Sequence, residues 1–354
     1  MRGALFLFLM TPGLTTVTAC SDGKDDTSPT VSSDTDTDTD TDTDTDTDAD
    51  ADTDTDTDTD TDTDTDTDTD TDTDTDTDTD RPDPTYGLST QTLVHDKVTR
   101  EYLLYVPKSY DGSTDVPLML NFHGWGDQAN GQMSVSDMRP LAESENFILV
   151  YPQGTLLEGF SHWNTYLPGP DNKSEADDYG FVDVMLESLA TDYAIDEDRV
   201  YATGFSNGGD FAYTLACFLS DKIAAVAPVS GLMWVQTERD CVPTHPTAVL
   251  HFHGTSDSDR PYDGFPGYLM SLDEILTYWN RHNNILGAPT VTSFSDSGLN
   301  IERYDYAGGD GDVALTHYKI LGGWHMWFSF SDGGADTNRL IWDFVSRFDT
   351  DGAR

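Results

Sequence analysis

The chain has 354 residues, and 18 Lys and Arg against 66 Asp and Glu give it a formal net charge of −48. One tract, residues 34–80, carries aspartate at every even position, and the part from Arg81 onward still holds 39 acidic against 16 basic residues. Such a chain lacks the cationic surplus of nucleic-acid-binding proteins, and three cysteines are too few for a disulfide-built scaffold.

The first segment, residues 1–19, is typical of a signal peptide for export. Arg2 provides a positive start, and an apolar run follows at residues 4–10. The segment ends in Val17-Thr18-Ala19-Cys20, which resembles the lipobox of bacterial lipoproteins. We therefore expect Cys20 to carry the lipid and to be the only membrane attachment, at the outer membrane or cell surface. The alternative is a plain secretory signal.

Residues 20–84 predict a disordered linker. The Thr-Asp repeat has no aromatic residue and no aliphatic residue larger than alanine, so it cannot build a core. Its evenly spaced negative charges repel one another and extend the chain, as in a stalk. Weak calcium binding and glycosylation of the threonines are the alternatives. The two prolines of Arg81-Pro82-Asp83-Pro84 end the repeat.

Residues 85–354 predict a single catalytic domain of the α/β class. Short apolar runs predict strands at 101–106, 118–122, 147–151, 200–203, 224–229, 249–252, 301–306 and 315–320. Helical periodicity predicts helices at 135–144, 180–193, 207–219, 273–283 and 337–348. This alternation favours a mainly parallel sheet flanked by helices. Functional residues of such sheets gather at the carboxyl ends of the strands.

The G-x-S-x-G motif Gly204-Phe205-Ser206-Asn207-Gly208 lies between a predicted strand and a predicted helix. A serine at such a tight turn projects its hydroxyl above the sheet, and the small residues around it allow the strained backbone. The sequence therefore predicts Ser206 as a catalytic nucleophile.

A serine nucleophile needs a base and an orienting acid, which follow it in the chain in this type of fold. His325 lies in a Gly-rich loop just after the last predicted strand, which suits a base. His251 and His253 lie within a strand and are expected to have structural roles. Asp257 and Asp259 both follow the strand at 249–252, and spacing alone leaves both open as the acid.

The loop Asn121-Phe122-His123-Gly124-Trp125-Gly126 follows an early strand and predicts half of an oxyanion hole. The backbone N–H of Trp125 and that of Asn207, directly after the nucleophile, would stabilise the developing oxyanion. His, Asp and Glu residues show no zinc spacing, so we expect no metal and no cofactor.

Taken together, these stretches resemble the group of polyhydroxybutyrate depolymerases and feruloyl esterases, the carbohydrate esterase family 1. The matching stretches are 123–126, 163–164, 177–182, 204–217, 224–231, 253–262 and 322–327. The resemblance implies an α/β-hydrolase fold and ester hydrolysis through an acyl-enzyme. Its His-Gly-Thr-x-Asp pattern selects Asp257 over Asp259.

The sequence thus predicts a serine carboxylesterase that hydrolyses acyl or feruloyl esters of plant polysaccharide. The alternatives are a polyhydroxyalkanoate depolymerase and a non-catalytic surface adhesin built on a hydrolase fold. Trp163, Trp324 and Trp327 lie near predicted loops, where their rings would stack on an aryl group or a sugar. No prediction is made for the oligomeric state.

The two remaining cysteines predict a disulfide. Cys217 lies on the helix after the nucleophile, and Cys241 lies before the strand that leads to Asp257. Because an exported protein meets an oxidising compartment, we expect these two cysteines to be bonded.

Overall fold

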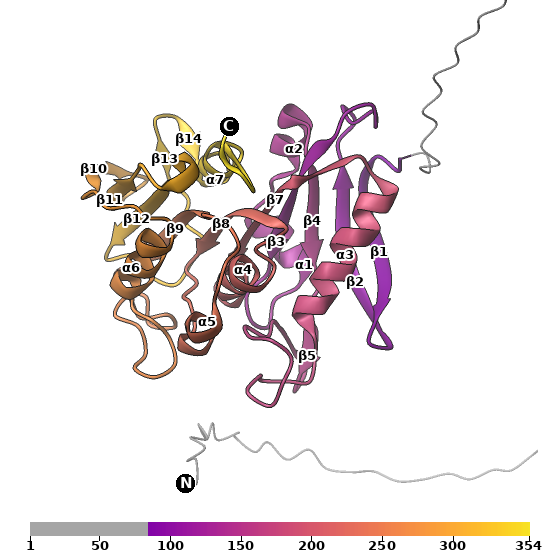
Figure 1. Ribbon diagram of the computed structural model, residues 1–354, viewed down its shortest axis with the longest axis horizontal. Helices are drawn as coiled ribbons and strands as arrows, with labels where there is room; N and C mark the ends of the chain where they lie inside the picture. Colours follow the sequence, from indigo (N-terminus) through magenta and orange to yellow (C-terminus); the bar gives the residue numbers. More distant parts are fainter. Residues whose placement is uncertain (1–83) are drawn as a thin grey trace, which may run out of the picture. The chain divides into compact units, whose positions relative to one another are not determined.

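The computed structural model describes residues 84–354, in which a ten-stranded sheet carries helices on both faces (Figure 1). The strand order across the sheet is β1 (Gly87–His95), β2 (Val98–Val106), β4 (Ile148–Pro152), β3 (Val116–Phe122), β7 (Ile195–Phe205), β8 (Ile223–Val229), β9 (Ala248–Gly254), β12 (Leu315–Leu321), β11 (Leu299–Tyr306) and β10 (Thr290–Asp296). Strands β4 to β12 in this order run parallel, and antiparallel strands extend the sheet at both edges. The predicted signal peptide, the lipid attachment at Cys20 and the Thr-Asp linker up to residue 83 lie outside the described residues.

All eight predicted strands are present, whereas the two edge strands β1 and β10 were not predicted. Alternate residues of β1 are exposed, and β10 is exposed along most of its length. Neither strand therefore has the continuous apolar run that identified the central strands. Three further two-stranded pairs are short: β5 (Thr155–Leu157) with β6 (Phe160–His162), β13 (Ser331–Asp332) with β14 (Ala335–Asp336), and β15 (Phe348–Asp349) with β16 (Gly352–Ala353).

Four predicted helices are confirmed: α3 (Asp178–Asp192), α4 (Asn207–Phe218), α6 (Leu272–His282) and α7 (Thr337–Val345). The single helix predicted at 135–144 is wrong, because the chain forms α1 (Ala129–Val135) and α2 (Arg139–Glu145) there instead. Ser136 lies between them, and its carbonyl accepts a hydrogen bond from the Tyr151 hydroxyl at 2.7 Å. The short α5 (Val235–Asp240) was not predicted.

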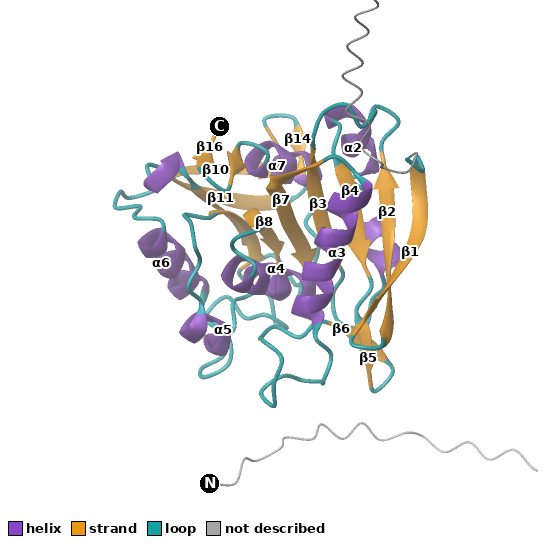
Figure 2. Ribbon diagram, turned by 45° about the vertical axis from the view of Figure 1, so that its right-hand side comes forward, coloured by secondary structure: helices purple, strands orange, loops and turns teal. Residues whose placement is uncertain are grey.

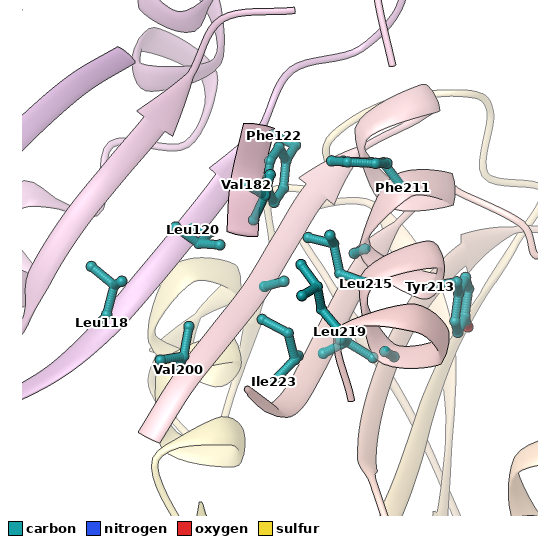
Figure 3. Packing of buried hydrophobic residues seen from close by; sticks show 14 of the residues in the cluster. Leu118, Leu120, Phe122, Val182, Val200, Phe211, Tyr213, Leu215, Leu219 and Ile223 are labelled. Carbon is teal, nitrogen blue, oxygen red and sulfur yellow. The ribbon is translucent and has the colours of Figure 1, made fainter. Parts of the chain in front are cut away.

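Helices cover both faces of the sheet (Figure 2), and the strand side chains divide between two hydrophobic cores. On β3, Leu118, Leu120 and Phe122 pack in the core that includes residues of α3 and α4 (Figure 3), whereas Met119 packs in the core that includes α7. This alternation follows from the two-residue period of a strand. Because a shift by one residue would exchange the two sets of side chains between the cores, this alternation fixes the register of the strand in the sheet. Within residues 84–354, no helix is both long enough and apolar enough to span a membrane.

Candidate active site

Ser206 lies at the turn between β7 and α4, in a backbone conformation that side chains rarely adopt. Its φ is 54° and its ψ is −117°. The neighbouring glycines permit this turn because a Cβ on Gly208 would lie 2.3 Å from the Phe122 carbonyl oxygen, and one on Gly204 would lie 2.6 Å from the Gly208 backbone. The G-x-S-x-G motif therefore reflects a close approach of three backbone segments. Such strain is characteristic of functional positions.

The structure brings Ser206, His325 and Asp257 together from the ends of three strands. His325 Nε2 lies 2.8 Å from Ser206 Oγ, and His325 Nδ1 lies 2.7 Å from Asp257 Oδ2. The exposed Asp259 lies outside this chain of hydrogen bonds, and its backbone N–H instead donates to Asp257 Oδ1 at 2.9 Å. The geometry therefore favours Asp257 as the acid.

Asp257 is held as a carboxylate. Burial alone would raise its pKa, but hydrogen bonds from His325 and from the Arg260 backbone N–H at 2.8 Å outweigh burial and lower the pKa. A carboxylate at Asp257 accepts a hydrogen bond from His325 Nδ1–H, which leaves Nε2 unprotonated and able to accept a hydrogen bond from the Ser206 hydroxyl. This is the arrangement in which a histidine can act as a general base toward a serine.

A chain of buried histidines lies behind the acid. His253 Nε2 donates to the Arg260 carbonyl at 2.7 Å, so its Nδ1 accepts from His251 Nε2 at 3.1 Å. His251 Nδ1 in turn accepts from the Tyr213 hydroxyl at 2.6 Å. Burial lowers the pKa of His253 to about 4. The structural roles expected for His251 and His253 agree with these contacts.

The loop after β3 packs directly against the nucleophile turn. A Cβ on Gly124 would lie 3.2 Å from Phe205 Cδ1 and 3.4 Å from Ser206 Cβ, so the loop lies in close contact with the turn and a larger residue would press on the Phe205 ring. Within residues 84–354, no acceptor is hydrogen-bonded to the backbone N–H of Trp125 or of Asn207. Both N–H groups are therefore available to a substrate oxygen.

A pocket of about 680 Å³ opens beside Ser206 and His325. Its remaining wall is formed by Gly124, Trp125, Asp127, Lys173, Phe205, Trp234, Asp259, Arg260 and Leu269. The volume is within the range of sites that enclose a small organic ligand.

The prediction that Trp163 contacts the substrate is wrong. Its side chain is fully buried, its Nε1 donates to the His123 carbonyl at 2.9 Å, and its ring stacks on Phe211. Trp327 packs against the core on the α7 face, and Trp324 is 71% exposed; neither lines the pocket. Contact of Trp324 and Trp327 with a substrate stays a prediction.

Two charged residues of the pocket wall, Arg260 and Lys173, have no role predicted from the sequence, and neither has Asp210, which contacts Arg260. Asp210, in the first turn of α4, is buried and pairs with Arg260, whose Nη2 lies 2.8 Å from Asp210 Oδ2. Asp210 also accepts the Leu232 backbone N–H at 2.7 Å, which fixes the loop after β8. Lys173 lies in the long loop before α3. A single lysine in a polar loop carries no sequence signal.

The Cys217–Cys241 disulfide is confirmed. It joins α4, which begins at the nucleophile turn, to the segment after α5 that precedes β9. The bond thus connects the helix that follows Ser206 to the segment that leads into β9 and Asp257.

One group within residues 84–354 has the residue types of a metal site: His95, Asp96 and Asp177, whose candidate ligand atoms lie within 4.8 Å of one another. Asp177 already has two other contacts, since it accepts the Gly180 backbone N–H at 2.9 Å and lies 2.9 Å from His95 Nε2. The contact with Gly180 caps the start of α3, so Asp177 has a structural role in this group.

Comparison with known proteins finds no family model that matches the chain, but it finds related sequences. A bifunctional acetylxylan esterase/xylanase of Neocallimastix patriciarum is 31% identical over 254 residues, which cover 72% of this chain and 34% of that protein. Feruloyl esterase B of Piromyces equi is 28% identical over 70% of this chain and 45% of its own length. A probable feruloyl esterase C of Aspergillus terreus is 28% identical over 70% of this chain and 84% of its own length.

The first two relatives are much longer than their match, so this chain spans between a third and a half of their length. Among solved structures, an acetyl xylan esterase from Aspergillus awamori superposes with a TM-score of 0.51 at 17% identity, over 67% of this chain and 94% of that one. This likeness, with the mostly parallel sheet, confirms the predicted α/β-hydrolase fold.

Proposed function

Because the chain is a homologue of feruloyl and acetylxylan esterases, as its motifs predicted, we propose that it is a serine carboxylesterase. The observation that carries the proposal is the continuous hydrogen-bonded chain from Ser206 Oγ through His325 to Asp257, at 2.8 and 2.7 Å. It opens into a pocket large enough for an ester. The same arrangement argues against a non-catalytic adhesin, which would not need three aligned polar side chains.

In the proposed acylation step, Ser206 Oγ attacks the ester carbonyl carbon while His325 Nε2 takes the hydroxyl proton. The carbonyl oxygen becomes an oxyanion, which the N–H groups of Trp125 and Asn207 stabilise. Asp257 stabilises the positive charge that forms on His325. The tetrahedral intermediate then expels the alcohol, which leaves with the proton from His325.

In the proposed deacylation step, a water molecule loses a proton to His325 Nε2 and attacks the acyl carbon bound to Ser206. The second tetrahedral intermediate collapses, the bond to Ser206 Oγ breaks, and His325 returns the proton to the serine. The carboxylic acid is released. The dense hydrogen bonding of Asp257 keeps His325 in one orientation through both steps.

We propose acyl or feruloyl esters of plant polysaccharide as the substrates. The names of the relatives support this class. Trp125 and Trp234 on the pocket wall offer flat surfaces for an aryl group or a sugar ring.

We also propose that the protein works outside the cytoplasm, attached through a lipid on Cys20. The disulfide supports an oxidising location. The signal peptide, Cys20 and the Thr-Asp tract lie outside the described residues, so this proposal rests on their sequence.

A panel of esters tests the proposed activity: methyl ferulate, acetylated xylan, 4-nitrophenyl acetate and polyhydroxybutyrate. We expect the wild-type protein to release acid from at least one of the first three, and Ser206→Ala to release almost none while keeping its unfolding temperature. Equal turnover by wild type and Ser206→Ala would refute the serine mechanism. A preference for polyhydroxybutyrate would replace the substrate class and leave the mechanism standing.

A further inference from the structure

Lys173 occupies an unusual position in the candidate pocket. Its Nζ lies 5.5 Å from the ring centroid of Trp125 and 4.9 Å from that of Trp234, so the cation stands between the two indole rings. All three side chains line the same pocket as Ser206 and His325. Cation–π contacts of this kind hold an ammonium group in place without neutralising it.

Lys173 differs from the other cation of the pocket in having no counter-ion. The guanidinium of Arg260 forms an ion pair with Asp210, in which Nε and Nη2 both lie within 3.2 Å of the carboxylate. By contrast, within residues 84–354 no side chain or carbonyl forms a hydrogen bond or ion pair with Lys173 Nζ. A half-buried ammonium without a hydrogen-bonding partner is costly in the free protein, and a ligand that accepts a hydrogen bond from it would reduce this cost.

The loop that carries Lys173 is firmly tied to the rest of the domain. Asn164 Nδ2 donates to the carbonyls of Ser174 and Ala176 at 3.1 and 2.6 Å, and Ser174 Oγ contacts His162 Nε2 at 2.8 Å. Asn172 Nδ2 donates to the Leu167 carbonyl at 2.8 Å. The lysine is therefore presented by an anchored loop, so its position in the pocket is built into the fold.

We propose that Lys173, Trp125 and Trp234 form an anion-accepting subsite that takes a flat ring bearing a carboxylate. The inference rests on the proposed esterase function, because the ring is part of the ester that Ser206 attacks. Lys173 donates a charge-assisted hydrogen bond to the carboxylate, and the indole rings contact the ring faces. The ring is an aryl ring, and it belongs either to the acid part of the ester or to the alcohol part.

The charges around the subsite make its preference for a carboxylate over a neutral group dependent on pH. Burial, the largest influence, lowers the pKa of Lys173 to about 8. The carboxylates of Asp210 and Asp178 raise it, and the neighbouring Arg260 lowers it further. Asp127 and Asp259 also line the pocket. The ammonium form is present below this pKa, so a preference for carboxylate should fade as pH rises through about 8.

Two matched pairs of esters test the proposal and show whether the ring belongs to the acid part or to the alcohol part of the ester. 4-Acetoxybenzoate and 4-acetoxybenzamide differ in charge on the alcohol side, and methyl 4-carboxycinnamate and methyl 4-carbamoylcinnamate differ on the acid side. The measured quantity is the ratio of kcat/KM for the carboxylate to that for the carboxamide. Comparing this ratio between variants cancels the intrinsic reactivity of each ester.

We expect Lys173→Met to lower this ratio by roughly tenfold to a hundredfold in at least one pair, mainly through KM. Lys173→Arg should keep most of the ratio and lose its dependence on pH near 8. Lys108→Met, which removes an exposed charge outside the pocket, should leave the ratio unchanged. An unchanged ratio for Lys173→Met in both pairs would overturn the proposal.

Binding to the Ser206→Ala variant separates this inference from the proposed activity. Tryptophan fluorescence reports occupancy by 4-acetoxybenzoate or 4-acetoxybenzamide without any turnover. We expect tighter binding of the carboxylate in Ser206→Ala, and loss of that preference in the double variant with Lys173→Met. Absence of the preference in Ser206→Ala refutes the subsite even if esters are hydrolysed. Its presence supports the subsite even if the ester chemistry proves wrong.

Discussion

Replacing Asp257 with asparagine isolates the electrostatic part of the proposed mechanism. The two oxygens of Asp257 accept different hydrogen bonds: Oδ1 accepts from the backbone N–H groups of Asp259 and Arg260, and Oδ2 accepts from His325. The carbonyl oxygen of an asparagine can still accept the two backbone hydrogen bonds. Its amide nitrogen would then face His325 Nδ1 across a distance of 2.7 Å in the native protein.

The amide nitrogen can only donate, so His325 must carry its proton on Nε2 and accept a hydrogen bond on Nδ1. In that tautomer Nε2 can no longer take the proton of Ser206. We expect kcat to fall by about 10⁴, equivalent to about 5 kcal/mol in the activation free energy. The buried backbone contacts survive, so the unfolding temperature should change little.

The matched control is Asp259→Asn, two residues away. Asp259 is exposed, and the backbone N–H that it contributes to the site is unaffected by the substitution. Its kcat on 4-nitrophenyl acetate should stay within about threefold of wild type, a change below 1 kcal/mol. Both variants are compared at equal folded concentration, checked by circular dichroism. If the two folded variants lost activity equally, the assignment of Asp257 as the acid would be wrong.

Three further predictions concern stability and attachment. Burial lowers the pKa of His253 to about 4, so between pH 6.5 and 4 the unfolded chain binds a proton that the folded chain does not. The free energy of unfolding should therefore drop by about 2 kcal/mol from this residue between pH 7 and 5, and a flat urea-denaturation profile for wild type would contradict this. The double variant Cys217→Ala with Cys241→Ala opens a loop with a separation of 24 residues and should lose roughly 3 kcal/mol; an unchanged urea midpoint would count against a stabilising bond. Cys20→Ser should release the protein from the membrane fraction or leave an uncleaved precursor, and unchanged fractionation and mass would remove the lipid from the account.

The residues that the sequence identified are those whose backbone surroundings restrict the choice of amino acid. Ser206 is recognisable because Gly204 and Gly208 must be small where three backbone segments meet. The central strands are recognisable because both faces are buried, which demands continuous apolar runs.

The sequence was least informative where a role depends on packing between distant segments. Trp163 follows the short strand β6 and lies beside an exposed loop, yet its ring fills the core between Phe122 and Phe211. Lys173 is brought between two indoles that lie 48 residues before it and 61 after it in the chain. No local pattern records such a meeting.

The two edge strands have a consequence for how copies of this domain behave in solution. Strands β1 and β10 contain one formally charged side chain between them, Asp296, although unpaired backbone groups at a sheet edge invite other strands to pair. From Arg81 onward the chain has 39 acidic and 16 basic residues, so two copies repel each other electrostatically. This repulsion acts at distances larger than that of strand pairing, before the sheet edges meet. Salt shortens that range from about 10 Å at 0.1 M to about 3 Å at 1 M. Ionic strength therefore sets the colloidal stability of the domain, because repulsion by the net charge, and not charged side chains on the edge strands, keeps the sheet edges of two copies apart.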